Sequence, residues 1–124
     1  MADTSPVPQI PAAAVPAGAY LLDVREYEEW DAGHAPGAVH IPLGELGARY
    51  TELARDRPLY VICRSGIRSD HAAHALAGAG WDASNVADGM MGWHASGLPM
   101  TSASGEPYVA CRHGCGPTGC QPGS

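Results

Sequence analysis

The chain has 124 residues, which is enough to bury one hydrophobic core but not two, so a single domain is expected. Its formal net charge is -6, with seven arginines and no lysine, which leaves no basic face for a nucleic-acid backbone. No apolar run approaches the roughly 20 residues that span a bilayer, and the N-terminal residues lack the pattern of a secretory signal. These features argue against nucleic-acid and membrane partners and favour a cytoplasmic protein.

The predicted elements alternate between short apolar runs and helix-compatible segments. Residues 1–6 are expected to be a tail. Pro8, Pro11 and Pro16 indicate a terminal strand followed by a loosely wound segment that leads to the next strand. Strands are then predicted over residues 19–24, 38–42, 59–63 and 84–88, and helices over residues 25–33, 43–54, 68–80 and 89–97. This alternation predicts βαβ units, that is, an α/β fold with a parallel sheet covered by helices.

The last part of the chain, residues 101–124, is rich in Gly, Pro, Ser and Cys and is predicted to be an irregular tail. The compact domain is therefore expected to cover about residues 7–100. Three of the four cysteines, Cys111, Cys115 and Cys120, lie in the tail, whereas Cys63 stands alone in the domain. In a reducing compartment, such thiols are more often catalytic, metal-binding or simply buried than paired in disulfides.

Cys63 comes directly after the predicted strand "LYVI" and before a predicted helix. Ligands of open α/β sheets bind at the carboxyl ends of the strands, so this position is a functional one. Ser65 and Gly66 suit a tight turn, in which the backbone N–H groups of residues 64–68 would converge on the sulfur. Those donors, the N-terminus of the next helix and the charges of Arg64 and Arg68 would lower the pKa of the thiol.

The alternative is that Cys63 acts only as a small buried hydrophobic residue at the end of a strand. A structural thiol needs neither two arginines nor a Ser-Gly turn immediately after it. The loop therefore favours a nucleophilic thiolate in an anion-binding site.

Four segments in order resemble the rhodanese-like sulfurtransferases. They are "LLDVREYEEWDAGHAPGAVHIP", "LYVI", the loop "CRSGIRS" and "DGMMGWHASGLP", and together they cover most of residues 7–100. The resemblance implies a small, mainly parallel sheet flanked by helices on both faces. It also implies that Cys63 carries a sulfane sulfur as a persulfide, and that the substrate-binding loop consists of Arg64, Ser65, Gly66, Ile67 and Arg68.

Other positions that match the family are expected to support the site. Asp23 and Arg25 would brace it, and Arg25 could pair with Glu29, four residues later. His34 and His40 are expected to be structural, because a preformed thiolate needs no separate base. The family pattern is broken by Asp88, which replaces a glycine in a turn, and by the apolar Ile67, which could bias the choice of acceptor. Gly33, Gly37 and Pro42 would shape a turn into the next strand.

The reaction expected from the resemblance moves sulfur from thiosulfate or a similar donor to cyanide or a thiol, with no cofactor and no metal. The acceptor could also be a protein thiol. Two alternatives remain, namely a sulfur-carrier or interaction module for a dedicated partner and a thiolate-based phosphatase or arsenate reductase. The second is disfavoured because Arg68 is five positions after Cys63, whereas such enzymes place the arginine six positions after the cysteine.

Two sets of side chains could hold a metal in principle. His71 and His74 share a helical face, but two ligands make a poor site, and Ala72, Ala73 and Leu76 form the opposite, core-like face. In the tail, His113 joins the three cysteines in a zinc-compatible set with an uncommon spacing, and a mobile thiol relay or a plain flexible tail are the alternatives. Met90, Met91 and Trp93 are expected to pack in the core or at the rim of the pocket.

Overall fold

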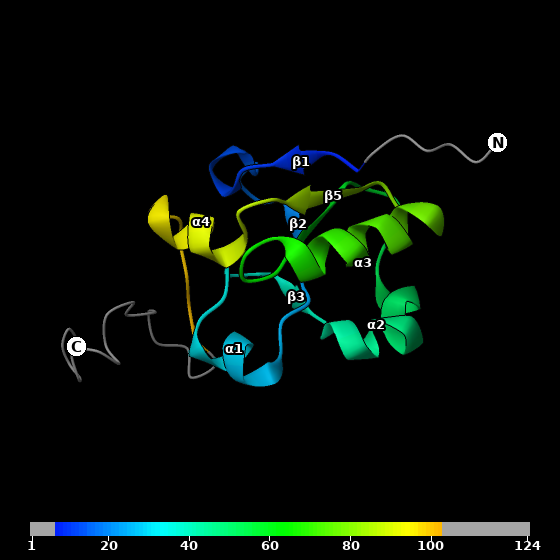
Figure 1. The fold of residues 1–124 in the computed structure, drawn as a ribbon, viewed down its shortest axis with the longest axis horizontal. Coiled ribbons are helices and arrows are strands. Elements are labelled where there is room, and N and C mark those ends of the chain that lie inside the picture. Colours follow the sequence, from blue (N-terminus) through cyan, green and yellow to red (C-terminus); the bar gives the residue numbers. More distant parts are fainter. Residues whose placement is uncertain (1–6, 103–124) are drawn as a thin grey trace.

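The structure is a computed structural model that describes residues 7–102. It contains five strands, β1 (Gln9–Ile10), β2 (Tyr20–Asp23), β3 (Val39–His40), β4 (Leu59–Ile62) and β5 (Ala83–Val86). The α-helices are α1 (Tyr27–Ala32), α2 (Leu43–Arg49), α3 (Ile67–Gly78) and α4 (Gly89–Ala95), and two short 3₁₀ helices are η1 (Ala12–Ala14) and η2 (Tyr50–Glu52). Their arrangement is drawn in Figure 1.

The five strands form one parallel sheet in the order β1-β5-β4-β2-β3. The central strand β4 pairs with β2 on one side, where Asp23 lies opposite Ile62, and with β5 on the other, where Asn85 lies opposite Val61. The predicted α/β fold with a parallel sheet is therefore confirmed. Because parallel strands end at the same edge, Asp23 and the residue after Ile62 come close together.

Helices cover both faces of the sheet. On one face, Leu22, Val61 and Leu59 pack against buried side chains of α2 and α3, among them Leu46 and Leu76. On the other face, the core holds Leu21, Ile62 and Val86 from the sheet, Ala12 from η1, and Met90 and Trp93 from α4. In Figure 1, α2 and α3 lie side by side, and α4 lies beside the carboxyl end of β5.

Most predicted elements are present, with shifted ends. The predicted helix over 43–54 is split, because Arg49 leaves the helical region and a 3₁₀ turn follows. The helix predicted from residue 25 begins at Tyr27, after the N-cap residue Glu26. Ala72, Ala73 and Leu76 form the buried face of α3, as the spacing predicted.

At the C-terminal end, Thr101 and His34 exchange backbone hydrogen bonds in an isolated antiparallel bridge. The division into residues 1–6, 7–100 and 101–124 stays a prediction. The tail residues Cys111, His113, Cys115 and Cys120 lie outside the described residues. Among residues 7–102, no helix is long and apolar enough to cross a membrane.

Candidate active site

The candidate site is the loop between β4 and α3. Cys63 follows the last residue of the central strand and is only 1% exposed. Its Sγ accepts a hydrogen bond from the backbone N–H of Gly66 at 3.1 Å, and the Ser69 hydroxyl lies 3.3 Å away in a hydrogen-bonding position. The loop thus curls around the sulfur and directs donors at it.

The start of α4 holds the outer side of this loop. The backbone N–H groups of Met90 and Met91 donate to the carbonyl oxygens of Cys63, at 2.7 Å, and Arg64, at 3.0 Å. Because the N–H and C=O of a peptide point in opposite directions, anchoring these two carbonyls turns the amides of Arg64 and Ser65 away from α4. The helix therefore helps to set the direction of the loop's backbone donors.

Two glycines are required where the loop meets its neighbours. Gly66 has φ of +98°, and a Cβ there would overlap the carbonyl group of Ala87. Gly89 has φ of +58°, and a Cβ there would overlap the carbonyl oxygen of Cys63 and lie 2.5 Å from that of Arg64. The left-handed turn before α4 thus falls on Gly89, and Asp88, at φ of -99°, needs no unusual backbone conformation.

The environment of Cys63 favours the thiolate. Burial of the sulfur raises the pKa of the thiol, which is the largest single effect. Hydrogen bonds from the side chain and backbone of Ser69, and from the amides of Gly66 and Ser65, together outweigh burial. The pKa of Cys63 therefore lies below its ordinary value, in the direction that the sequence predicted.

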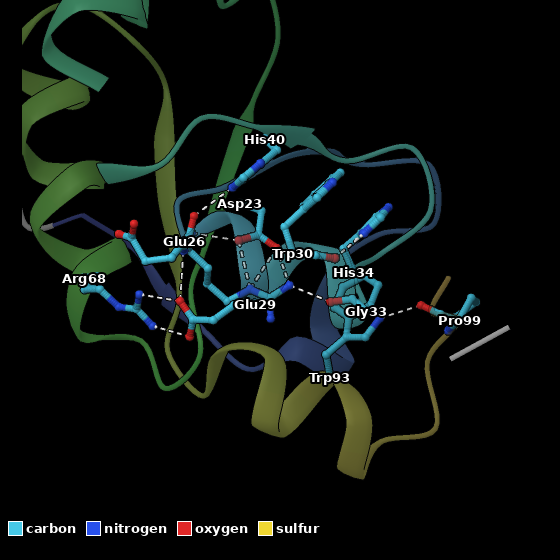
Figure 2. Close-up of polar contacts among 11 residues, drawn as sticks. Asp23, Glu26, Glu29, Trp30, Gly33, His34, His40, Arg68, Trp93 and Pro99 are labelled. Carbon is cyan, nitrogen blue, oxygen red and sulfur yellow. Dashed lines mark hydrogen bonds and ion pairs between the residues drawn. The ribbon is translucent and has the colours of Figure 1, made fainter. Parts of the chain in front are cut away.

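The two arginines of the loop differ in their surroundings. Arg68 is paired with Glu29 of α1 through two contacts of 2.8 and 3.0 Å, as Figure 2 shows. Its hydrogen bonds to Glu29 are the main reason why the pKa of that carboxyl falls to about 2. Arg64, by contrast, is exposed. The charge of Arg68 is thus largely compensated by Glu29, whereas the charge of Arg64 faces the solvent.

The expected pairing of Arg25 with Glu29 is wrong. Arg25 forms a buried ion pair with Asp23 at 2.8 Å and also donates to the carbonyl oxygen of Gly33 at 2.7 Å. Arg25 precedes the first helical residue, so the geometry of residues four apart on a helix does not apply to it. Glu29 instead caps α1 by accepting the backbone N–H of Glu26 at 2.9 Å.

A pocket of about 440 Å³ opens beside the loop, between α1 and α4. Its walls combine charged side chains with thioethers and small residues, namely Arg25, Glu29, Ala32, Gly33, Arg64, Met90, Met91, His94, Ala95 and Met100. Ile67, at the first turn of α3, is 68% exposed. Met90 and Trp93 are buried whereas Met91 is exposed, so these residues divide between core and rim as expected.

The histidines have partners of their own. Ring N–H groups of His34 and His40 donate to the backbone carbonyls of Trp30, at 2.8 Å, and Arg25, at 2.7 Å. Both rings also stack on the indole of Trp30 (Figure 2). These contacts agree with a structural role. His74 is exposed on α3 and contacts Asp70.

No group of three or more His, Cys, Asp or Glu side chains within residues 7–102 is placed to hold a metal ion.

Sequence reasoning missed two buried polar residues next to the sulfur. Ser69 lies on α3 and Asn85 on β5, and the Ser69 hydroxyl is 2.6 Å from Asn85 Oδ1. A signal for Ser69 was present, because it stands three, four and seven positions before Ala72, Ala73 and Leu76, on the predicted core face. For Asn85 the signal was an amide side chain within a short, otherwise strand-like run.

Comparisons with known proteins agree with this geometry. The sequence model of the rhodanese-like domain family matches residues 11–96. The putative sulfur carrier protein YrkF of Bacillus subtilis is 47% identical over 74 residues, which are 59% of this chain but only 40% of YrkF. A protein named thiosulfate sulfurtransferase GlpE, from Actinobacillus succinogenes, is 39% identical over 88 residues, covering 70% of this chain and 79% of GlpE.

A solved structure is also similar. The crystal structure of a rhodanese-related protein from Thermoplasma volcanium superimposes with a TM-score of 0.72 at 32% identity, and the match covers 76% of this chain and 97% of that one. The matched family model covers β2 to β5 and the whole loop from Cys63 to Ser69. The chain therefore belongs to the rhodanese-like family.

Proposed function

We propose that this protein is a sulfurtransferase in which Cys63 carries a sulfane sulfur as a persulfide. The observation that carries the proposal is the position of Sγ, which the Gly66 amide and the Ser69 hydroxyl approach at 3.1 and 3.3 Å. Donors in this position stabilise an anionic sulfur. The name of GlpE, a thiosulfate sulfurtransferase, supports thiosulfate as the donor.

In the first step, the Cys63 thiolate attacks the outer sulfur of thiosulfate. A new S–S bond forms, the S–S bond of thiosulfate breaks, and sulfite leaves with the electron pair of that bond. The lowered pKa of Cys63 provides the thiolate without a separate general base. The negative charge passes to the outer sulfur of the persulfide, where the loop amides of residues 64–68 can stabilise it.

In the second step, cyanide or a thiolate attacks the outer sulfur of the persulfide. The acceptor leaves as thiocyanate or as a new persulfide, and the Cys63 thiolate is regenerated. The pocket beside Arg64 supports an acceptor larger than cyanide, such as a low-molecular-weight or protein thiol. The exposed Ile67 offers apolar contact to such an acceptor.

The loop residues take different parts in this proposal. Arg64 attracts the anionic donor, Ser65 and Gly66 supply backbone donors, and Arg68 holds the start of α3 to α1 through Glu29. We take residues 7–100 as the catalytic domain. Because Cys63 must be reduced to react, a cytoplasmic location fits the proposal.

The test is the fate of one sulfur atom. After incubation with thiosulfate, the intact protein should gain the mass of one sulfur, peptide analysis should place it on Cys63, and cyanide should remove it as thiocyanate. Cys63→Ser should gain nothing, because a hydroxyl cannot form a persulfide. As a matched control, replacing Cys111, Cys115 and Cys120 with serine should leave the transfer intact. Sulfur transfer by Cys63→Ser would reject the assignment.

A sulfur-carrier function is the second candidate, because YrkF is named a putative sulfur carrier protein. A carrier would take sulfur from the persulfide of a partner protein rather than from thiosulfate. Failure of the wild-type protein to react with thiosulfate, together with transfer of radiolabelled sulfur from a donor protein persulfide to Cys63, would favour the carrier over the enzyme.

A further inference from the structure

A buried polar network lies directly behind the reacting sulfur. Ser69 is 0% exposed and Asn85 is 1% exposed. The Ser69 Oγ lies between two acceptors, at 3.3 Å from Cys63 Sγ and 2.6 Å from Asn85 Oδ1. Because both side chains are shielded from bulk solvent, the two acceptors share the single proton of the Ser69 hydroxyl.

The orientation of the Asn85 amide is fixed by its other contacts. Its Nδ2 donates to the backbone oxygen of Gly66 at 3.0 Å and to Gln9 Oε1 at 2.8 Å. A backbone carbonyl can only accept, so the amide nitrogen must face Gly66. Gln9 is held in turn, because its Nε2 donates to Asp70 Oδ1 at 2.7 Å. Asn85 therefore presents an oxygen, never a donor, to Ser69.

A serine hydroxyl has one proton, and here two acceptors compete for it. When Cys63 is a neutral thiol, its S–H can donate to Ser69 Oγ while Ser69 donates to Asn85, and every group is satisfied. When Cys63 is a thiolate, Sγ needs the same Ser69 proton that Asn85 Oδ1 accepts. One of these two acceptors then lacks the hydrogen bond from the Ser69 hydroxyl, although Sγ keeps the backbone donor of Gly66. The loss of that hydrogen bond raises the free energy of the thiolate state relative to the thiol state.

We propose that Asn85 is a positioning residue that acts through Ser69, because its side-chain oxygen competes with Cys63 Sγ for the single hydroxyl proton. This inference rests on Cys63 as the reacting sulfur. Asn85 thus makes the thiolate less stable than it would be without this competitor. The Ser69 hydroxyl turns from Asn85 Oδ1 to Cys63 Sγ when negative charge develops on the sulfur. The carbonyl of Gly66 is not left without a donor when Asn85 is replaced, because the N–H of Asp70 also reaches it at 3.2 Å.

The charged groups around Cys63 do not take part in this competition. Arg68, at the start of α3, couples electrostatically to Cys63 and remains paired with Glu29. The carboxylate of Asp70 accepts from Gln9 and lies beside His74, and only the uncharged backbone N–H of Asp70 contacts Gly66. Substitution of Asn85 therefore changes the distribution of one proton without adding or removing a charge.

The experiment measures the pH dependence of Cys63 alkylation by iodoacetamide in the full chain, followed by mass spectrometry of the peptide that contains Cys63. Asn85→Val removes the competing acceptor, so the thiol pKa should fall by roughly half a unit or more. Ser69→Ala should raise that pKa. In the Ser69→Ala background, Asn85→Val should have no further effect, because Asn85 acts only through the hydroxyl.

Ser84→Val is the matched control, since Ser84 neighbours Asn85 on β5 but its side chain points to the opposite face of the sheet. It should leave the pKa unchanged. Should Asn85→Val not fold, Asn85→Thr serves instead, because its hydroxyl can donate to Ser69 and should also lower the pKa. An unchanged or raised pKa in the Asn85 variants, or an equal shift without Ser69, would overturn the proposal.

The readout separates this proposal from the proposed function. Alkylation uses no sulfur donor, so the expected pKa pattern in a protein that transfers no sulfur would reject the sulfurtransferase and retain the role of Asn85. Normal sulfur transfer without the expected pKa pattern would reject the role of Asn85 and retain the sulfurtransferase.

Discussion

Gly89 is the point at which α4 meets the Cys63 loop, and Gly89→Ala tests how tightly the two are joined. The new Cβ would overlap the carbonyl oxygen of Cys63 and lie 2.5 Å from that of Arg64. The variant must therefore separate α4 from the loop, which breaks the hydrogen bonds from the amides of Met90 and Met91. The amide of Ser65, which stabilises the sulfur and shares a peptide with the anchored carbonyl of Arg64, should lose its alignment.

The expected loss of stability has two parts. A residue other than glycine at positive φ costs about 1–2 kcal/mol, and each lost hydrogen bond costs about 1 kcal/mol, so Gly89→Ala should lower the free energy of unfolding by about 3–4 kcal/mol. Gly97→Ala is the matched control, because Gly97 also has positive φ, +71°, but no heavy atom lies within 4 Å of its Cβ position. It should cost only the strain, about 1–2 kcal/mol, and leave sulfur transfer unchanged.

Urea unfolding followed by tryptophan fluorescence gives both values, since Trp93 lies buried in α4. Thiosulfate-dependent sulfur loading of Cys63, measured well below the unfolding midpoint, gives the effect on the site. Gly89→Ala should load sulfur at least tenfold more slowly than the wild-type protein, whereas Gly97→Ala should match it. Equal destabilisation of the two variants with full loading in both would refute the argument that α4 aligns the loop.

Two further predictions concern the charges around the loop. Arg64→Ala should raise the KM for thiosulfate roughly three- to tenfold and weaken the dependence of KM on salt. Arg68→Ala should mainly lower the stability, because the charge of Arg68 is already paired with Glu29. Equal increases in KM in the two variants would contradict this division of roles. The pKa of Glu29 falls from its usual 4.5 to about 2 in the folded protein, so its ion pair stabilises the fold fully above pH 4.5 and is lost as the pH falls towards 2. Urea unfolding should therefore show that the stability gap between the wild-type protein and Glu29→Gln narrows over this range, and a constant gap would count against the pairing.

Much of the fold followed from local patterns in the sequence. Short β-type runs such as "LYVI" and "YLLD" alternate with helical segments, and parallel pairing is what such alternation requires. The turn after Cys63 could also be predicted, because its conformation depends on neighbours in the chain, above all on Gly66 at positive φ. Turn chemistry of this kind is local and therefore can be predicted.

What sequence reasoning missed depends on contacts between distant residues. Glu29 and Arg68 are 39 positions apart, and Ser69 and Asn85 are 16 apart. Each pair is joined only because β2, β4 and β5 end at the same edge of the sheet. The rule that pairs residues four apart failed for Arg25, because the helix begins two residues later. The pairing of these side chains could therefore be identified only from the tertiary structure, although the residues themselves are evident in the sequence.

The strand order has a consequence for folding during synthesis. Of the five strands within residues 7–102, β1 is made first but pairs with β5, which is made last, so Gln9 and its partner Asn85 are separated by 76 residues. The edge strand stays unpaired until β5 has left the ribosome, and it is only two residues long and flanked by Pro8 and Pro11. Short, proline-flanked edges are poor templates for pairing with other chains, which protects the nascent protein from aggregation. The hydrogen bonds behind Cys63 can form only at the end of this sequence of events, so an incompletely made chain presents its thiol without the full set of donors.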